Sequence, residues 1–141
     1  MIGFDGVYGY DLVTHRLFGS VSDKSYDTHV AVSPDGSRVY ITSVPFPVYG
    51  VAPAPNAVRV FDRNLVEQAP ISFTRQFGDR TPVLRGVLVS RDNESLYLQA
   101  GDRDFFGEGM LRVLVLNLTT GSVTRIISTG VYGRATMILG H

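Results

Sequence analysis

Residues 28–65 decide the fold: this stretch begins THVAVSPDGSRVYITS and ends VRVFDRNL. Its Ser-Pro-Asp-Gly segment at 33–36 is a strong turn signal, because proline presets φ and glycine accepts a positive φ. After the turn the side chains alternate, with Val39 and Ile41 on one face of a strand and Tyr40 on the other. We therefore expect three consecutive antiparallel strands, at 28–33, 37–43 and 57–62.

Most of this pattern returns later in the chain. HVAVSPDGSRVYITS (29–43) aligns with GVLVSRDNESLYLQA (86–100), an offset of 57 residues. VRVFDRNL (58–65) aligns with LRVLVLNL (111–118), an offset of 53 residues, and the difference falls in loops, where changes of length cost little. A repeat of about 50 residues with four strands per unit is the signature of a β-propeller blade.

SPDGSRVYITS followed by VRVFD resembles the YVTN-type β-propeller repeats, which are related to the lactonase-like and NHL-like propellers. The resemblance covers nearly the whole chain, and its motif implies a blade hairpin rather than a reaction. The second copy departs from it, with Arg91-Asp92-Asn93-Glu94 in place of Pro-Asp-Gly-Ser. We expect this hairpin to persist, because asparagine tolerates a left-handed backbone. A β-sandwich of about ten strands is the alternative fold, but it gives no reason for a four-strand unit to recur.

We expect one all-β domain over residues 1–141, a partial β-propeller whose ring is incomplete in one chain and which has almost no helix. Propellers close with about four to eight blades, and closure removes exposed strand edges. Two whole blades cannot make a ring, so we predict assembly, either as a homodimer that closes the propeller or with the remainder of a larger propeller. The expected units are a partial blade at 4–22, whole blades at 28–77 and 84–128, and a strand at 134–139 that completes a shared blade.

The composition points away from several classes of protein. Thirteen basic and thirteen acidic side chains cancel, so there is no electrostatic reason to expect a nucleic acid or an anionic membrane as partner. The absence of cysteine removes disulfides and thiolate metal ligands. No apolar run approaches the roughly 20 residues of a membrane-spanning helix, and the N-terminus has no signal-peptide pattern. We expect a soluble protein and leave its compartment open.

The candidate sites follow from the expected topology, which places the long connections at one face around the channel mouth. Long loops at one end of a rigid scaffold are where binding usually occurs. An aromatic set in these loops is a candidate partner-binding patch, unless it packs the loops onto the blades: Phe46, Tyr49, Phe105, Phe106 and Tyr132. The candidate ligand-binding residues lie in or beside the same loops: His29, Arg85, Arg134, Asp79, Asp102 and Arg103.

Each of these polar residues also has a structural interpretation. Arg85 and Arg134 can bind a carboxylate or phosphate bidentately, or they can tie loops together through nearby acidic residues. His29 can act as a general base, or it can be a buried, hydrogen-bonded residue. The repeated Gly-Asp-Arg segments around Asp79 and Asp102 can form a polar patch or a weak calcium site, or merely local ion pairs. We predict no catalytic residue, no metal centre and no cofactor.

The sequence favours a non-catalytic β-propeller binding or scaffold module that holds a ligand or protein partner through the long-loop face. No P-loop, dinucleotide fingerprint, zincin motif or nucleophile elbow is present. The alternative is a lactonase-like or lyase-like propeller enzyme that acts on a small substrate at the channel mouth. The resemblance permits this alternative without matching any catalytic motif.

Overall fold

The computed structural model describes residues 2–3, 6–22, 25–45, 57–72, 83–101 and 110–132. Across these residues the chain is all β, and no residue is helical, as expected. It follows that the described part holds no helix long and apolar enough to cross a lipid bilayer. The strands form three antiparallel sheets, which we number in chain order.

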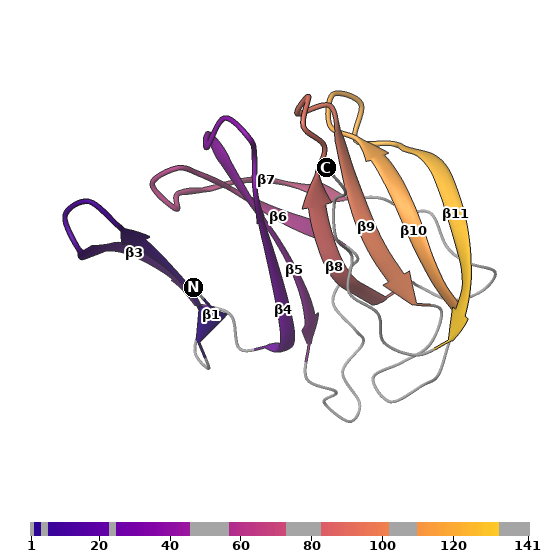
Figure 1. The fold of residues 1–141 in the computed structure, drawn as a ribbon, viewed down its shortest axis with the longest axis horizontal. Coiled ribbons are helices and arrows are strands. Elements are labelled where there is room, and N and C mark those ends of the chain that lie inside the picture. Colours follow the sequence, from indigo (N-terminus) through magenta and orange to yellow (C-terminus); the bar gives the residue numbers. More distant parts are fainter. Residues whose placement is uncertain are drawn as a thin grey trace.

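Each sheet is a meander, in which strands that follow one another in the sequence lie side by side (Figure 1). The first sheet contains β1 (Ile2–Gly3), β2 (Gly6–Asp11) and β3 (Arg16–Ser22). The second contains β4 (Ser25–Val32), β5 (Arg38–Pro45), β6 (Ala57–Asp62) and β7 (Glu67–Ser72). The third contains β8 (Val83–Val89), β9 (Ser95–Gly101), β10 (Met110–Asn117) and β11 (Val123–Tyr132).

Two strands of the second sheet begin earlier than predicted. The first of them, β4, starts at Ser25 rather than at residue 28. β7 starts at Glu67, whereas the sequence pattern placed a turn as far as the residue before Pro70. Asp62 closes a shorter turn, because its carboxylate accepts hydrogen bonds from the backbone N–H groups of Asn64 (2.8 Å) and Val66 (2.9 Å). Pro70 cannot donate to a sheet ladder, and it lies in the edge strand beside an irregularity in the β6–β7 register.

Two further differences lie at the ends of the chain. The two-residue strand β1 was not predicted, and it pairs with β2 through Ile2 and Gly3. β11 continues to Tyr132, four residues beyond the predicted end of the last blade. The short strand predicted at 134–139 lies outside the described residues.

The second sheet lies between the other two and is buried on both faces (Figure 1). In each sheet we call the face toward the next sheet in the sequence the downstream face and the opposite one the upstream face. In the third sheet, the upstream face is the one that packs on the second sheet. On the upstream face, Val39, Ile41 and Phe61 form a core with Val7 and Val21 of the first sheet. The downstream face forms a larger core with the third sheet, through Ala31, Tyr40, Val58 and Val60 on one side and Leu84, Val87, Val89, Leu96, Leu98, Ala100, Leu114 and Leu116 on the other.

The first hairpins of the second and third sheets are built in the same way. In the second sheet the hydroxyl of Ser33 donates to Asp35 (2.6 Å) and accepts from the backbone N–H of Arg38 (2.9 Å). The third sheet repeats both bonds from Ser90, to the carboxylate of Asp92 (2.5 Å) and from the N–H of Ser95 (2.8 Å). The left-handed position is filled by Gly36 (φ 67°) in one hairpin and by Asn93 (φ 61°) in the other, so the prediction for asparagine is confirmed.

The turn between β2 and β3 matches the turn between β10 and β11. Asp11 accepts from the backbone N–H groups two and three residues later, at 2.8 and 2.9 Å. Asn117 does the same at 3.0 and 2.8 Å. The fifth residue of each turn has a positive φ, 54° at His15 and 65° at Gly121. β2 and β3 therefore correspond to the third and fourth strands of the later sheets.

The strand register corrects the alignment of the repeat. Tyr40 pairs with Val60, and its equivalent Tyr97 pairs with Val115. The third strands are therefore related by an offset of 55 residues rather than the 53 residues suggested by the sequence. A slip of two residues leaves every side chain on its own face, because a strand repeats every two residues. Apolar similarity alone therefore could not detect it.

The two ends of the sheets differ in their connections. The hairpins β4–β5, β6–β7, β8–β9 and β10–β11 lie at one end, which we call the hairpin end. β5 and β9 run away from it, so the connections to β6 and β10 leave from the opposite, long-loop end (Figure 1). Over the described residues the three sheets do not close into a ring.

Candidate functional site

The described residues include the side chains of only two predicted site residues, His29 and Arg85. Tyr132 is the last residue of β11, and its backbone pairs with Met110. The other predictions lie outside the described residues: Arg134, Asp79, Asp102 and Arg103 of the ligand set, and Phe46, Tyr49, Phe105 and Phe106 of the partner set.

His29 lies on the downstream face of the second sheet, in the middle of β4. It pairs across the ladder with Thr42 of β5, which shares its face with the buried Tyr40. Thr42 is 0% exposed, and its hydroxyl has no hydrogen-bond partner among the residues that the structure describes. The Nε2 atom of His29 is also buried. A buried hydroxyl without a partner costs stability, so this polar pair is an unusual feature of the second sheet.

Arg85 lies at a β-bulge in the third sheet, between Leu84 and Gly86 in the ladder with β9. Its Nε atom is 3.6 Å from the position that a Cβ would take on Gly101. Gly101 shares its face with Gln99, opposite the Leu98 that packs against the second sheet. The guanidinium of Arg85 therefore lies toward the downstream face of the third sheet. His29 faces the upstream side of that sheet, so the described structure does not join the two side chains into one site.

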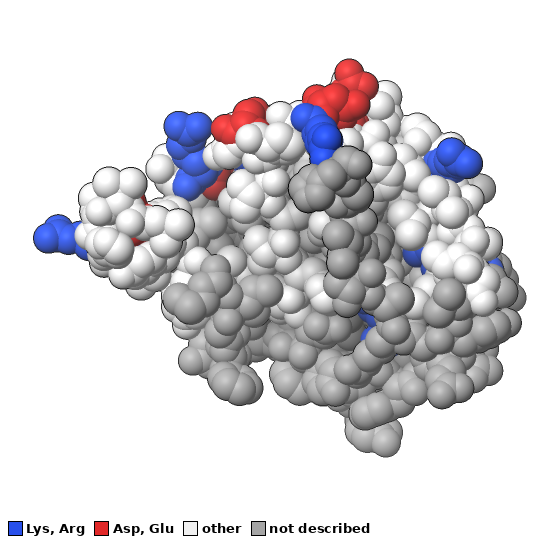
Figure 2. All heavy atoms as spheres, in the orientation of Figure 1, with Lys and Arg blue, Asp and Glu red and all other residues white. Residues whose placement is uncertain are grey.

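A pocket that the sequence analysis missed opens at the hairpin end, with a volume of about 360 Å³. Charged side chains gather along this edge, which is the upper edge in Figure 2. The pocket lies between the β4–β5 hairpin, the β8–β9 hairpin and the β10–β11 turn. Its lining residues are mostly polar: Ser33, Asp35, Ser37, Arg38, Tyr40, Asn93, Leu118 and Thr119. The signal in the sequence was the repeated Ser-x-Asp turn, which we interpreted only as a hairpin.

Asp35 is the strongly perturbed acid of this pocket. Its carboxylate accepts hydrogen bonds from the Ser33 hydroxyl and from the backbone N–H and hydroxyl of Ser37, at 2.6, 3.0 and 2.8 Å. These bonds, the Ser33 bond first, lower its pKa from 3.8 to about 2, and Asn93 adds a smaller contribution. The Ser90 hydroxyl likewise lowers the pKa of Asp92. The carboxylates act mainly to hold the turns, since Oδ1 of each accepts hydrogen bonds within its own hairpin.

This arrangement predicts an acid dependence of stability. Because the pKa of Asp35 is lower in the folded state, its contribution is complete at pH values above 3.8 and is lost as the pH falls towards 2. As the pH falls across this range, the free energy of unfolding, measured in urea, should therefore decrease less in Asp35→Asn than in the unaltered chain. Glu94→Gln, which removes an exposed carboxylate from the other hairpin, is the matched control. It should lose as much stability at acid pH as the unaltered chain does. An equal loss of stability at acid pH in Asp35→Asn and in the unaltered chain would contradict the prediction.

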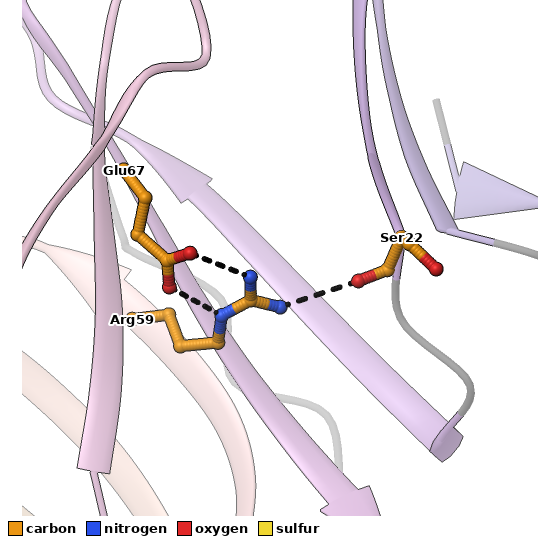
Figure 3. Close-up of polar contacts among 3 residues, drawn as sticks. All are labelled: Ser22, Arg59 and Glu67. Carbon is orange, nitrogen blue, oxygen red and sulfur yellow. Dashed lines mark hydrogen bonds and ion pairs between the residues drawn. The ribbon is translucent and has the colours of Figure 1, made fainter.

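Arg59 joins the first and second sheets (Figure 3). Its guanidinium donates from Nε and Nη2 to the two carboxylate oxygens of Glu67, at 2.8 and 3.1 Å, and from Nη1 to the carbonyl of Ser22, at 3.4 Å. Its central carbon lies 4.9 Å from the centroid of the Phe61 ring. The hydrogen bond from Arg59 lowers the pKa of Glu67. Because both side chains are partly exposed, we assign the pair an orienting role rather than a large energy.

Metal-ligating groups do not converge in the part of the chain that the structure describes. No group of three or more histidine, cysteine, aspartate or glutamate side chains there could hold a metal ion. Within the described ranges, the pocket at the hairpin end brings several polar side chains together, whereas His29 in the middle of β4 and Arg85 near the start of β8 lie apart.

Comparisons with known proteins add little to this description. No protein-family model matches the chain, and no curated protein matches it. Among solved structures, the chain is similar to a chain of Kuenenia stuttgartiensis hydrazine synthase, with 18% sequence identity and a TM-score of 0.43. The match covers 88% of this chain and 43% of that chain, so the protein spans less than half of the length of its neighbour. A likeness at this level transfers neither fold nor function.

Proposed function

We propose that the chain forms an arc of YVTN-like β-propeller blades and serves as a non-catalytic binding or scaffold module. It holds a ligand or a protein partner through its long-loop end. In the topology predicted from the sequence, the ligand-binding residues His29 and Arg85 belong to this end, together with the loop residues of both predicted sets. The blade type is suggested by the Ser-x-Asp hairpin, which recurs at residues 33–37 and 90–94.

The observation that carries this proposal is the burial of the second sheet on both faces. In a two-layer β-sandwich each sheet has one buried face, whereas each blade of a propeller lies between two neighbours. β8, the first strand of the third sheet, also packs against β4 and β5 of the second sheet. Sheets that stack in chain order through their first strands are the arrangement expected of consecutive blades.

A scaffold of this kind favours binding at the end where the connections are long. Between β5 and β6 the sequence runs from Pro45 to Ala57, and between β9 and β10 from Gly101 to Met110. At the hairpin end the connections are short and are closed by bonds such as those from Asp11 and Asn117. Variable segments carried by a rigid sheet are common binding surfaces in proteins.

Nuclear magnetic resonance with two small probes tests the proposal. The carboxylate 5-hydroxyvalerate is expected to shift amide signals next to Arg85 and to leave those of residues 33–37 unchanged, because Arg85 lies near the long-loop end. The ring of its cyclic precursor δ-valerolactone is expected to hydrolyse no faster with the protein than in buffer alone. Arg85→Ala should lose the shifts, and Arg38→Ala, which removes a guanidinium from the hairpin end, should keep them.

Two outcomes would overturn this proposal. Shifts confined to the pocket around Asp35 and Asn93 would place binding at the hairpin end. Ring opening well above the buffer rate, lost in both His29→Ala and Arg85→Ala with unchanged circular dichroism, would favour the lactonase-like enzyme.

A further inference from the structure

We propose that the downstream face of the third sheet binds the upstream face of the first sheet of a second copy of this chain. This inference rests on the propeller arrangement proposed above and names the surfaces that would join. Two copies, each with three sheets, would then give a ring of about six, within the usual range of propellers.

Apart from its long-loop end, where Leu111 and Gln99 are already buried, the downstream face of the third sheet has the residue pattern of a face that receives another sheet. In the second sheet this face carries Val58 and Val60, which are 0% and 4% exposed because the third sheet covers them. The register gives their equivalents in the third sheet as Val113 and Val115. These two valines are partly exposed, and Ile127, which pairs with Val113, is 38% exposed.

The upstream face of the first sheet is the complementary surface. Because Asp11 corresponds to Asn117 in the turn that follows the third strand, Tyr10 corresponds to Leu116. Leu116 is fully buried against the second sheet, whereas Tyr10 is 43% exposed. Its ladder partner Leu17 is 56% exposed. Apolar side chains thus stand in the first sheet where the third sheet has buried core residues.

A second copy satisfies both surfaces at once. The upstream and downstream faces already meet twice within the chain, at the contact of the first with the second sheet and of the second with the third. A head-to-tail pair would bring the same two kinds of face together twice more, through the third and fourth strands that the first sheet shares with the later sheets. Symmetric dimers that bury such faces are the commonest closed assemblies.

Single cysteines test the predicted contact, because the chain has none of its own. Leu17→Cys and Ile127→Cys proteins are unfolded together in urea, refolded as a mixture and treated with a short bifunctional maleimide. The mixture is expected to yield a covalent dimer, whereas either variant alone is not, because the two-fold axis separates identical positions. Covalent dimers of Leu17→Cys with itself, or equal yields in all three samples, would overturn the proposal.

Light scattering across a dilution series provides an independent readout. The unaltered chain is expected to have about twice the mass of one 15.4 kDa chain, and Leu17→Asp is expected to have the mass of one chain. Leu12→Asp is the matched control, because Leu12 lies in the β2–β3 turn and is 79% exposed. A single-chain mass for the unaltered protein would overturn the proposal that a second copy covers the downstream face of the third sheet. The probe experiment with 5-hydroxyvalerate would still report separately on the proposed function.

Discussion

Replacement of Leu98 by alanine is expected to lower the free energy of unfolding by about 2–5 kcal/mol, the range for large-to-small changes in protein cores. Leu98 lies in the middle of β9, is 0% exposed and faces the second sheet. Its neighbours in this core come from two sheets, including Val58 and Val60 of the second. The cavity left by the substitution would therefore lie at the contact between sheets, where no single sheet can relax to fill it.

Urea unfolding followed by circular dichroism measures this loss, and Leu12→Ala is its matched control. Leu12 is 79% exposed in a turn, so its replacement should change stability by no more than about 0.5 kcal/mol. Equal effects of the two substitutions would mean that the second and third sheets do not pack through Leu98. That result would remove the basis for treating the sheets as stacked blades.

The local geometry of the repeat could be predicted from the sequence because it depends on short-range chemistry. The bounds of β6 and β10 and the left-handed backbone at Asn93 follow from alternation and turn residues. The early start of β7 escaped prediction because proline is tolerated as the first residue of a strand, so the strand was expected to begin at Pro70. The hydrogen bonds of Asp62 close the turn sooner.

Contacts between sheets could not be predicted in the same way. The Arg59 bond to the carbonyl of Ser22 joins positions 37 residues apart. No local sequence pattern in either segment predicts this contact. The pocket near Asp35 and Asn93 also requires two hairpins that meet only after the sheets stack. For the candidate site, the residue types and the long-loop end stay predictions. The sequence could not predict that His29 and Arg85 lie toward opposite faces of the third sheet.

The attachment of the first sheet explains why its position depends on a few side chains of the second. Val7 and Val21 are its members of the buried core with the second sheet. Leu65, in the β6–β7 turn, lies close to Gly9 and Gly19, where an added Cβ would stand 3.0 and 3.2 Å from its Cδ1 atom. The two glycines thus permit a close approach that larger residues would prevent. Phe61 completes this small contact, and Arg59 lies over its ring.

Phe61→Ala is therefore expected to loosen the first sheet selectively. Phe61 is 2% exposed, and truncation of a buried phenylalanine costs about 3–5 kcal/mol. Because the core that it shares with Val7 and Val21 is small, we expect this loss to appear as local opening of β2 and β3 rather than as uniform destabilisation. Hydrogen exchange should show a large loss of protection in β2 and β3 and a small one in β8, β9 and β10.

Phe18→Ala is the comparison variant, since Phe18 lies in β3 itself and is 53% exposed, with its ring over Gly9 rather than in the buried core. It should reduce protection in β2 and β3 much less than Phe61→Ala does, although it is nearer in the sequence. A uniform loss of protection across all three sheets in Phe61→Ala would contradict the prediction, because it would mean that the first sheet unfolds only together with the rest. Selective opening would instead show that the first sheet is held to the second mainly by the small core around Phe61.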